Sequence, residues 1–208
     1  MQNLKFIGML ILTILVLTLA GGKPSQANTI KHKPIHKHQH HKTKHKIHRK
    51  YTPANRVSDV IALQQTHHKY DKFFTAADSK ALPWKTLKVL CSTESNLKAN
   101  LVSNQGAMGI CQLKPRTFRR VMKSGNIGKP DLNILAASRH IKILDNSWKR
   151  AFTDPGQRQL ITIASYNAGE GNVLKAIKRC HGDNHASIKR CLPKETQAFV
   201  NTIVLASI

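Results

Sequence analysis

The sequence predicts a mainly α-helical fold for most of this chain of 208 residues. Apolar residues recur at helical spacing in several segments, as Leu87, Leu90 and Cys91 do after Pro83. Between these segments, the glycine-rich residues 100–113 leave room for at most a small β-hairpin. A chain of this length supports one substantial core. We therefore expect one helical domain over residues 55–208, behind an N-terminal extension.

The N-terminal residues 1–27 are typical of a secretory signal. Lys5 precedes an apolar run over residues 6–20, and small residues, Ser25 and Ala27, follow at a plausible cleavage position. This run is shorter than the roughly 20 residues that a membrane span needs. We expect export to the periplasm or cell envelope, with no stable membrane span after the signal is removed. A retained anchor stays open as an alternative.

Residues 28–54 are predicted to be a disordered tether rich in His and Lys. Within it, residues 31–50 contain eight Lys or Arg, seven His and no acidic residue, and they lack the apolar side chains of a core. The segment is suited to contact with anionic wall polymers, lipopolysaccharide or nucleic acid. The alternative is a solubilising linker. A third use is a loose metal site formed by His36, His38, His40 and His41.

Seven helices are expected in the domain. Pro83 suits a first helical position, since proline lacks the N–H that a first turn leaves unpaired. The expected helices cover residues 57–70, 83–95, 115–124, 131–152, 156–167, 170–179 and 193–207.

The net charge favours an anionic partner. The chain carries a formal charge of +24, and from residue 51 onward 24 Lys and Arg face all 10 acidic residues. Nucleic acid would satisfy this charge. However, the chain has eleven aromatic residues of the Phe, Trp and Tyr type and no basic stretch interleaved with them. The sequence therefore indicates general attraction without base recognition.

Glu94 is the candidate general acid. It falls at i+7 from Leu87, on the apolar face of the helix expected at 83–95. Burial disfavours the charged form of a carboxyl group and raises its pKa, which keeps an acid protonated near neutral pH. The spacing alone also allows Glu94 to end its helix and turn to solvent, or to pair with a Lys.

Four cysteines in an exported chain predict disulfides, and four cysteines allow three pairings. Cys180 and Cys191 bracket a polar loop, which a bond between them would stabilise by about 2 to 4 kcal/mol. Cys91 lies one turn before Glu94, so a bond to Cys111 would fix the helix of the acid to the segment that follows. Zinc binding is disfavoured because neither pair has CxxC spacing.

The residues after Glu94 form a dense motif, and two further blocks follow. The first block consists of Glu94, Ser95, Ser103, Gly106, Ala107, Gly109, Gln112, Pro115 and Thr117. The second contains Tyr166, Asn167, Ala168, Gly169, Gly171 and Val173, and the third contains Glu195, Thr196 and Val200. In this order the blocks resemble the lytic transglycosylase (SLT) domain family of the lysozyme-like superfamily, across residues 83–200.

The resemblance implies a lysozyme-like helical domain of the goose-type/SLT kind and an exported peptidoglycan lytic transglycosylase without cofactor or metal. Glu94 would protonate the oxygen between N-acetylmuramic acid and N-acetylglucosamine. It would then act as a base while the muramic carbon-6 hydroxyl closes a 1,6-anhydro ring. Tyr166 would orient Glu94. The residues expected to contact substrate are Ser103, Gln112, Lys114, Tyr166, Asn167 and Glu195.

Some positions depart from the family pattern. Lys114 stands where the family usually has Met, Phe199 lacks a hydroxyl, Ala137 replaces Gly, and His140 replaces Tyr. Glu195 shares an apolar stripe with Phe199, so it is either a buried core acid or a supporting residue of the site.

Two other functions stay open: a hydrolytic lysozyme on the same fold, and a basic module that binds wall or polyanion with little catalysis. The resemblance does not distinguish among secretion, conjugation, pilus and autolysis systems, so partner proteins of such a system stay open as well.

Overall fold

The computed structural model describes the backbone of residues 53–208 and the side chains from residue 56 onward. The predicted signal, residues 1–27, and nearly all of the predicted tether lie outside the described residues. Within the described part of the chain, no helix is long and apolar enough to cross a membrane.

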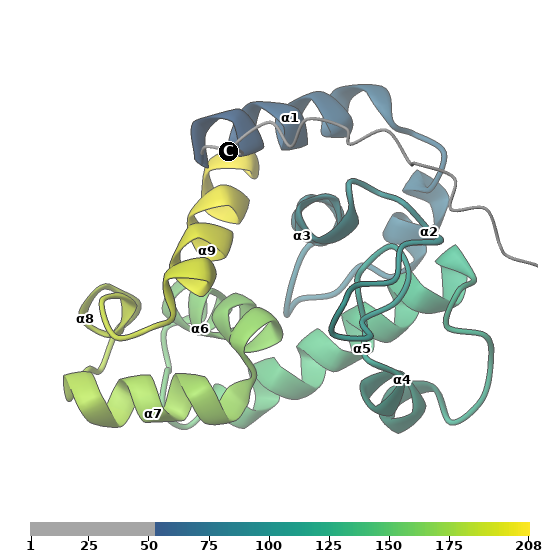
Figure 1. Cartoon of the computed structure of the whole chain (residues 1–208). Helices are drawn as coiled ribbons and strands as arrows, with labels where there is room; N and C mark the ends of the chain where they lie inside the picture. The colour runs from purple at the N-terminus through teal and green to yellow at the C-terminus, as the bar shows by residue number, and fades with distance from the viewer. Residues whose placement is uncertain (1–52) are drawn as a thin grey trace, which may run out of the picture. The chain divides into compact units, whose positions relative to one another are not determined.

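The described residues fold into nine α-helices, which confirms the predicted mainly helical class (Figure 1). Their bounds, in chain order, are α1 Pro53–Thr66, α2 Asp71–Ala76, α3 Trp84–Ser95, α4 Pro115–Met122, α5 Pro130–Trp148, α6 Pro155–Ala168, α7 Glu170–Cys180, α8 His185–Lys189 and α9 Lys194–Ala206.

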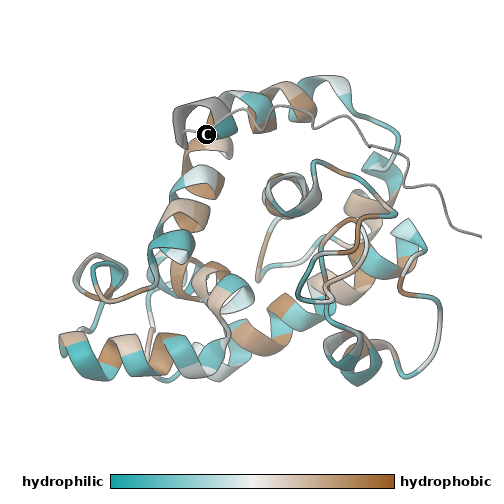
Figure 2. Ribbon diagram, in the orientation of Figure 1, coloured by the Kyte–Doolittle hydropathy of each residue, from teal (hydrophilic) through white to brown (hydrophobic). Residues whose placement is uncertain are grey.

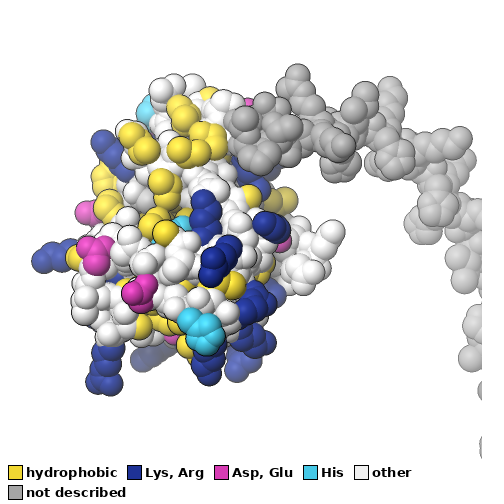
Figure 3. Space-filling model, turned by 90° about the vertical axis from the view of Figure 1, so that its left-hand side faces the viewer, with side chains coloured by type: hydrophobic (Ala, Val, Ile, Leu, Met, Phe, Trp, Pro, Cys, Tyr) yellow, Lys and Arg dark blue, Asp and Glu magenta, His cyan; other side chains and the backbone are white. Residues whose placement is uncertain are grey.

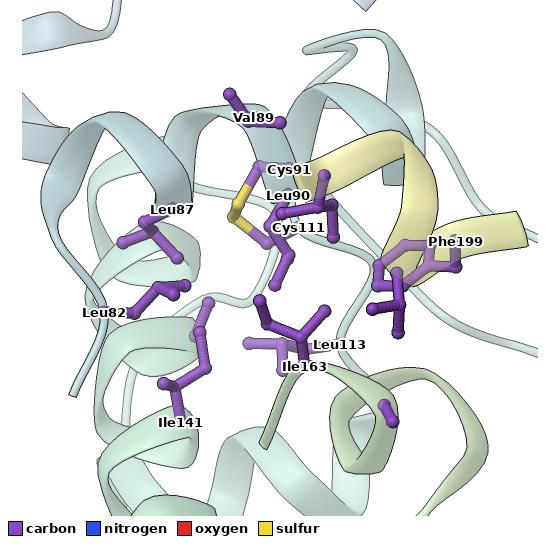
Figure 4. Packing of buried hydrophobic residues seen from close by; sticks show 14 of the residues in the cluster. Leu82, Leu87, Val89, Leu90, Cys91, Cys111, Leu113, Ile141, Ile163 and Phe199 are labelled. Atoms are coloured by element: carbon purple, nitrogen blue, oxygen red, sulfur yellow. A yellow bond between two sulfur atoms is a disulfide. The ribbon is translucent and has the colours of Figure 1, made fainter. Parts of the chain in front are cut away.

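Helix α3 lies at the centre of the arrangement. It contacts α1, α2 and α9, while α5 packs against α2, α4 and α6 (Figure 1). Buried side chains from these helices converge beneath α3, among them Leu87, Leu90, Ile141, Ile163 and Phe199 (Figure 4). Since eight of the twelve residues of α3 are buried, this helix is held on nearly all sides.

The first predicted helix, 57–70, is wrong at its C-terminal end. Helix α1 stops at Thr66, and a separate short helix, α2, begins at Asp71. The Asp71 carboxylate forms a hydrogen bond with His68 Nδ1 at 2.9 Å and an ion pair with Lys88 Nζ at 2.7 Å. Lys88 belongs to α3 and is buried, so this distant ion pair fixes the start of α2.

The loop expected between Cys180 and Cys191 contains a helix that the sequence analysis missed. Asn184 caps α8, with its side chain accepting a hydrogen bond from Ser187 N at 3.0 Å, and Ser187 Oγ reaches back to the Asn184 amide. Ile188 is fully buried. One apolar anchor and a capping box therefore suffice to order this short turn.

Residues 100–113 form no regular strands. Antiparallel bridges pair Met108 with both Val102 and Leu113. The segment is thus a compact, doubly folded loop, consistent with the prediction of at most a small hairpin.

Both disulfides named in the sequence analysis are present, Cys91–Cys111 and Cys180–Cys191. The first joins α3 to the folded loop and lies within the buried cluster of Figure 4. The second joins the end of α7 to the segment before α9. All four thiols are consumed, which excludes a zinc site at the cysteines.

Candidate active site

Glu94 lies at the next-to-last residue of α3, where the helix meets the loop over residues 100–113. Its side chain is partly buried. The helix ends at Ser95, whose hydroxyl donates a hydrogen bond to the Ile110 carbonyl at 2.6 Å. One turn earlier, Cys91 is bonded to Cys111. Two connections therefore fix the end of the helix that carries Glu94 to the loop.

The loop is held from below by Asn133, a buried residue of α5. Its side-chain oxygen accepts from Cys111 N at 2.9 Å, and its nitrogen donates to the carbonyls of Met108 and Ile127 at 3.1 and 2.8 Å. At Gly109, where φ is +80°, an added Cβ would come within 2.4 Å of the Asn133 amide. This close approach explains the second glycine of the motif.

Sequence reasoning missed Asn133 as an anchor. In the sequence, Asn133 stood out only by its place two residues after Asp131, in the same segment as Ala137 and His140, which were compared with the family pattern. Two of its three partners, Cys111 and Met108, are 22 and 25 residues away in the sequence, so helical spacing could not reveal them.

Gln112 and Ser103, two predicted substrate contacts, both support the loop. Gln112 has a positive φ of 51°, and its amide nitrogen donates to the carbonyls of Leu101 and Gly109 at 3.0 and 2.8 Å. Its amide oxygen is thereby aimed away from these carbonyls. Ser103 Oγ accepts from the Ala107 amide at 3.0 Å. Ser103 therefore holds a turn, whereas Gln112 keeps one acceptor for a ligand.

Burial sets the protonation of Glu94. It raises the pKa of this carboxyl from its ordinary value of 4.5 to about 7. The charge of Arg56 opposes the rise, and the charge of Glu195 adds to it. Arg56, on α1, donates to the Thr93 carbonyl at 2.9 Å, one residue before the acid. Sequence reasoning missed Arg56 because its helix is 37 residues from Thr93 along the chain.

Tyr166 lies next to the acid but does not hold it directly. Its hydroxyl donates to the Cys111 carbonyl at 2.6 Å. Burial and the charge of Glu94 raise the pKa of Tyr166 well above its ordinary value. Tyr166 thus stays neutral and acts as a donor that links α6 to the loop beside Glu94.

Asn167 and Glu195 come from the two elements that complete the site. The Asn167 side-chain oxygen accepts from Thr196 Oγ1 at 2.7 Å, which joins α6 to α9. Glu195 is exposed, so the prediction of a buried core acid is wrong. It lies in the first turn of α9, beside the exposed Pro193 and Lys194. Thr196, the next residue of that turn, is buried, whereas the exposed Glu195 affects the pKa of Glu94 through its charge.

Lys114 is exposed and immediately precedes α4. Its backbone caps that helix, with its carbonyl accepting from Phe118 N at 3.0 Å. The positive charge that lowers the pKa of Glu94 belongs to Arg56.

His140, another departure from the family pattern, borders Tyr166. The two ring centroids are 5.6 Å apart, with the planes tilted by 42°. Burial and the charge of Arg120 lower the pKa of His140 to about 4, against the opposing charge of Glu170. The imidazole is therefore neutral at neutral pH.

Within the described residues, no group of three or more His, Cys, Asp or Glu side chains is placed to hold a metal ion. The structure brings together one protonatable carboxyl, one neutral tyrosine and an acceptor amide, at the edge of a loop fixed to α3. This arrangement suits proton donation to an oxygen of a ligand that lies over the loop.

Residues 71–188 match the family described as Transglycosylase SLT domain. The chain belongs to this family. The match includes Glu94, the folded loop, Tyr166 and Asn167, and it stops before α9, which carries Glu195.

Named relatives of the SLT domain agree with this assignment. The chain is 28% identical over 126 residues to a membrane-bound lytic murein transglycosylase C of Photorhabdus laumondii subsp. laumondii, covering 55% of this chain and 35% of that protein. Proteins of the same name in Yersinia pestis and Yersinia pseudotuberculosis are 28% identical over 109 residues, covering 48% of this chain and 30% of theirs. The chain thus spans about a third of the length of these relatives.

Proposed function

We propose that this protein is an exported peptidoglycan lytic transglycosylase that cleaves the bond between N-acetylmuramic acid and N-acetylglucosamine and leaves a 1,6-anhydro-muramic end. The observation that carries the proposal is Glu94, a partly buried carboxyl with a pKa of about 7, in the complete first motif of an SLT domain. The lytic murein transglycosylases named above are similar over this domain.

In the proposed reaction, one carboxyl group performs two proton transfers. Protonated Glu94 gives its proton to the glycosidic oxygen, and the bond from that oxygen to the muramic carbon 1 breaks. The acetamido oxygen of the substrate stabilises the positive charge that develops. The Glu94 carboxylate then takes the proton of the carbon-6 hydroxyl, whose oxygen bonds to carbon 1. No water is consumed, and Glu94 ends protonated as it began.

A pKa near 7 suits both halves of this cycle. A carboxyl with an ordinary pKa would be ionised at neutral pH and would lack the proton to donate, whereas a much weaker acid would release it reluctantly. The buried face of α3 raises the pKa of Glu94, and Arg56 limits the rise.

The test is the chemical nature of the products. The full chain is incubated with purified sacculi, and the released fragments are analysed by mass spectrometry. Anhydro ends, each lighter by one water than a reducing end, are expected. Glu94→Gln should abolish release, whereas Asp59→Asn, at an exposed acid of α1, should not. Full activity in Glu94→Gln would contradict the assignment.

A hydrolytic lysozyme is the second candidate, and one observation favours it. The charge of Glu195 raises the pKa of Glu94, so the two carboxyl groups interact. Two-carboxylate glycosidases need a second acid within roughly 10 Å of the first. Reducing ends in the product, together with loss of activity in Glu195→Gln by orders of magnitude, would support hydrolysis over the lyase reaction.

We also propose that residues 31–50 bind anionic polymers of the cell envelope, on account of their fifteen Lys, Arg and His residues and lack of acids. Deletion of residues 28–50 should weaken sedimentation with insoluble wall, and the difference from the full chain should shrink as salt rises. Turnover of short soluble glycans should be kept. Loss of that turnover would show that the segment serves the chemistry.

A further inference from the structure

The α4–α5 rim, defined as helix α4 and the facing part of α5, is strongly cationic. Residues 114–129, which contain α4 and the segment leading to α5, hold six Lys or Arg and no acidic residue. Helix α4 buries Phe118 and exposes Arg116, Arg119 and Arg120, and Figure 2 shows it mostly in the hydrophilic colour. Basic side chains are also frequent on the face shown in Figure 3, but there Asp and Glu side chains lie among them.

One cation of this rim is fixed beside the site. The Arg120 guanidinium lies 3.0 Å from His140 Nδ1, through its Nη2. The His140 ring in turn packs against Tyr166, which borders Glu94. Arg120 is therefore connected to the site by two contacts.

The hydrogen-bond partner of His140 determines its protonation state and its tautomer. An arginine side chain can only donate, so Nδ1 must accept and the ring must be neutral, with its proton on Nε2. The low pKa of His140, about 4, agrees with this state. The groups that face the ring are Arg120 from α4, Tyr166 from α6 and the charge of Glu170 from α7.

A second guanidinium is anchored on the same rim. Arg139 Nη1 lies 3.2 Å from the Val121 carbonyl and 3.3 Å from the sulfur of Met122, both near the end of α4. Within the described residues, neither Arg120 nor Arg139 forms an ion pair with a carboxylate. Two exposed guanidinium groups are thus held in place by neutral partners.

We propose that Arg120, positioned by His140, binds a carboxylate of the substrate and makes the protein favour glycan strands that carry stem peptides. This inference rests on the proposed function, since the peptidoglycan peptide supplies the carboxylates. A guanidinium has five N–H donors, and His140 uses one. The others suit a planar carboxylate, which arginine binds through two parallel hydrogen bonds. Ordering by His140 reduces the entropy lost on binding.

The experiment compares two substrates with the full chain. One is a set of glycan oligomers with stem peptides, and the other is the same set after an amidase has removed the peptides. The measured quantity is the ratio of kcat/KM for the two. We expect Arg120→Gln to lower this ratio roughly fivefold to tenfold, mainly through KM on the peptide-bearing oligomers.

Matched variants separate recognition from general charge and from packing. Arg119→Gln makes the same charge change on the same exposed helix and should leave the ratio near that of the wild type. His140→Phe keeps an aromatic ring against Tyr166 and removes the acceptor, so it should lower the ratio. His140→Asn keeps an acceptor at the place of Nδ1 and should retain most of the ratio.

An equal effect of Arg120→Gln and Arg119→Gln would overturn the proposal in favour of a diffuse charge effect. An unchanged ratio in Arg120→Gln would overturn it as well. Binding of both oligomer sets to Glu94→Gln, measured by calorimetry, tests the same preference without catalysis. If the wild type released no anhydro ends but still bound peptide-bearing oligomers more tightly through Arg120, the proposed function would fail while this inference stood.

Discussion

The two sides of the site are held by different means. On the α3 side, a covalent disulfide and several hydrogen bonds of the Ser95 and Asn133 side chains fix the helix of Glu94 and the loop beside it. On the α6–α9 side, single side-chain hydrogen bonds from Tyr166 and Asn167 make the connections. The difference indicates that separate groups determine the position and the pKa of Glu94. The α3 side determines where the acid is, and more distant side chains adjust how strongly it holds its proton.

The largest effect is expected from the acid itself. Glu94→Gln should lower kcat by about 10²- to 10⁴-fold or more, since general acid–base catalysis contributes about that much and Glu94 serves twice. Release of soluble muropeptides from sacculi measures the loss. Wild-type rates in this variant would mean that the α3 side positions something other than the catalytic acid.

The same variant should be more stable than the wild type at alkaline pH. The folded pKa of about 7 lies above the ordinary 4.5, so between these values the folded state binds more protons than the unfolded state. The free energy of unfolding of the wild type should therefore fall as pH rises through this window. The shift corresponds to roughly 3 kcal/mol at most, less for a partly exposed group. Urea unfolding at pH 4.5 and pH 8 of both proteins tests the sign.

The two disulfides offer a direct contrast. Replacing Cys91 and Cys111 together by Ala, or Cys180 and Cys191 together, should cost about 2 to 4 kcal/mol of stability in either case. However, only the first pair joins the helix of Glu94 to the loop. Its loss should also lower kcat, even when kcat is measured well below the melting temperature of the variant. An equal drop in kcat for the second pair would remove the distinction between the two regions.

On the other side of the site, Tyr166→Phe should have an intermediate effect. It removes the donor to the Cys111 carbonyl and leaves that acceptor without its partner, at a cost of about 1 to 3 kcal/mol. We expect roughly tenfold lower kcat, because the loop moves relative to Glu94. Thermal unfolding measures the stability change. A kcat loss as large as that of Glu94→Gln would show that Tyr166 takes part in proton transfer.

The smallest effects should come from the two charges that act on Glu94. The proposed acid must be protonated, so activity should fall as pH rises through about 7. Glu195→Gln removes a negative charge, lowers the pKa and should shift this limb to lower pH. Arg56→Gln removes a positive charge and should shift it to higher pH. Profiles of kcat/KM against pH measure both shifts, and parallel shifts in the same direction would contradict the assignment.

The sequence predicted those features that depend on local spacing or on a dense motif. The helical class and the placement of Glu94 on a buried helix face follow from residues close together in the chain, and the even number of cysteines predicted disulfides without deciding their pairing. The contacts of Arg56 and Asn133 were not predictable in this way, because each joins segments brought together only by packing. The break before Asp71 was missed for the same reason, since Lys88 of α3 supplies its partner.

Glu195 shows the limit of pattern reasoning at a helix end. Its spacing relative to Phe199 and Ile203 indicated burial, and both of those residues are buried. The Glu195 side chain is nevertheless exposed, whereas that of Thr196, the next residue, is buried. Spacing along one helix therefore does not predict which side chains of its first turn the rest of the fold covers.

The contact between Gly109 and Asn133 restricts how this loop could have changed during descent. A methyl group at position 109 would have to displace the amide that holds Cys111, Met108 and Ile127. A lineage that lost Asn133 would gain space at 109, yet the positive φ there would still oppose any other residue. A substitution at position 109 is therefore opposed twice, by the Asn133 side chain and by the backbone conformation of the loop.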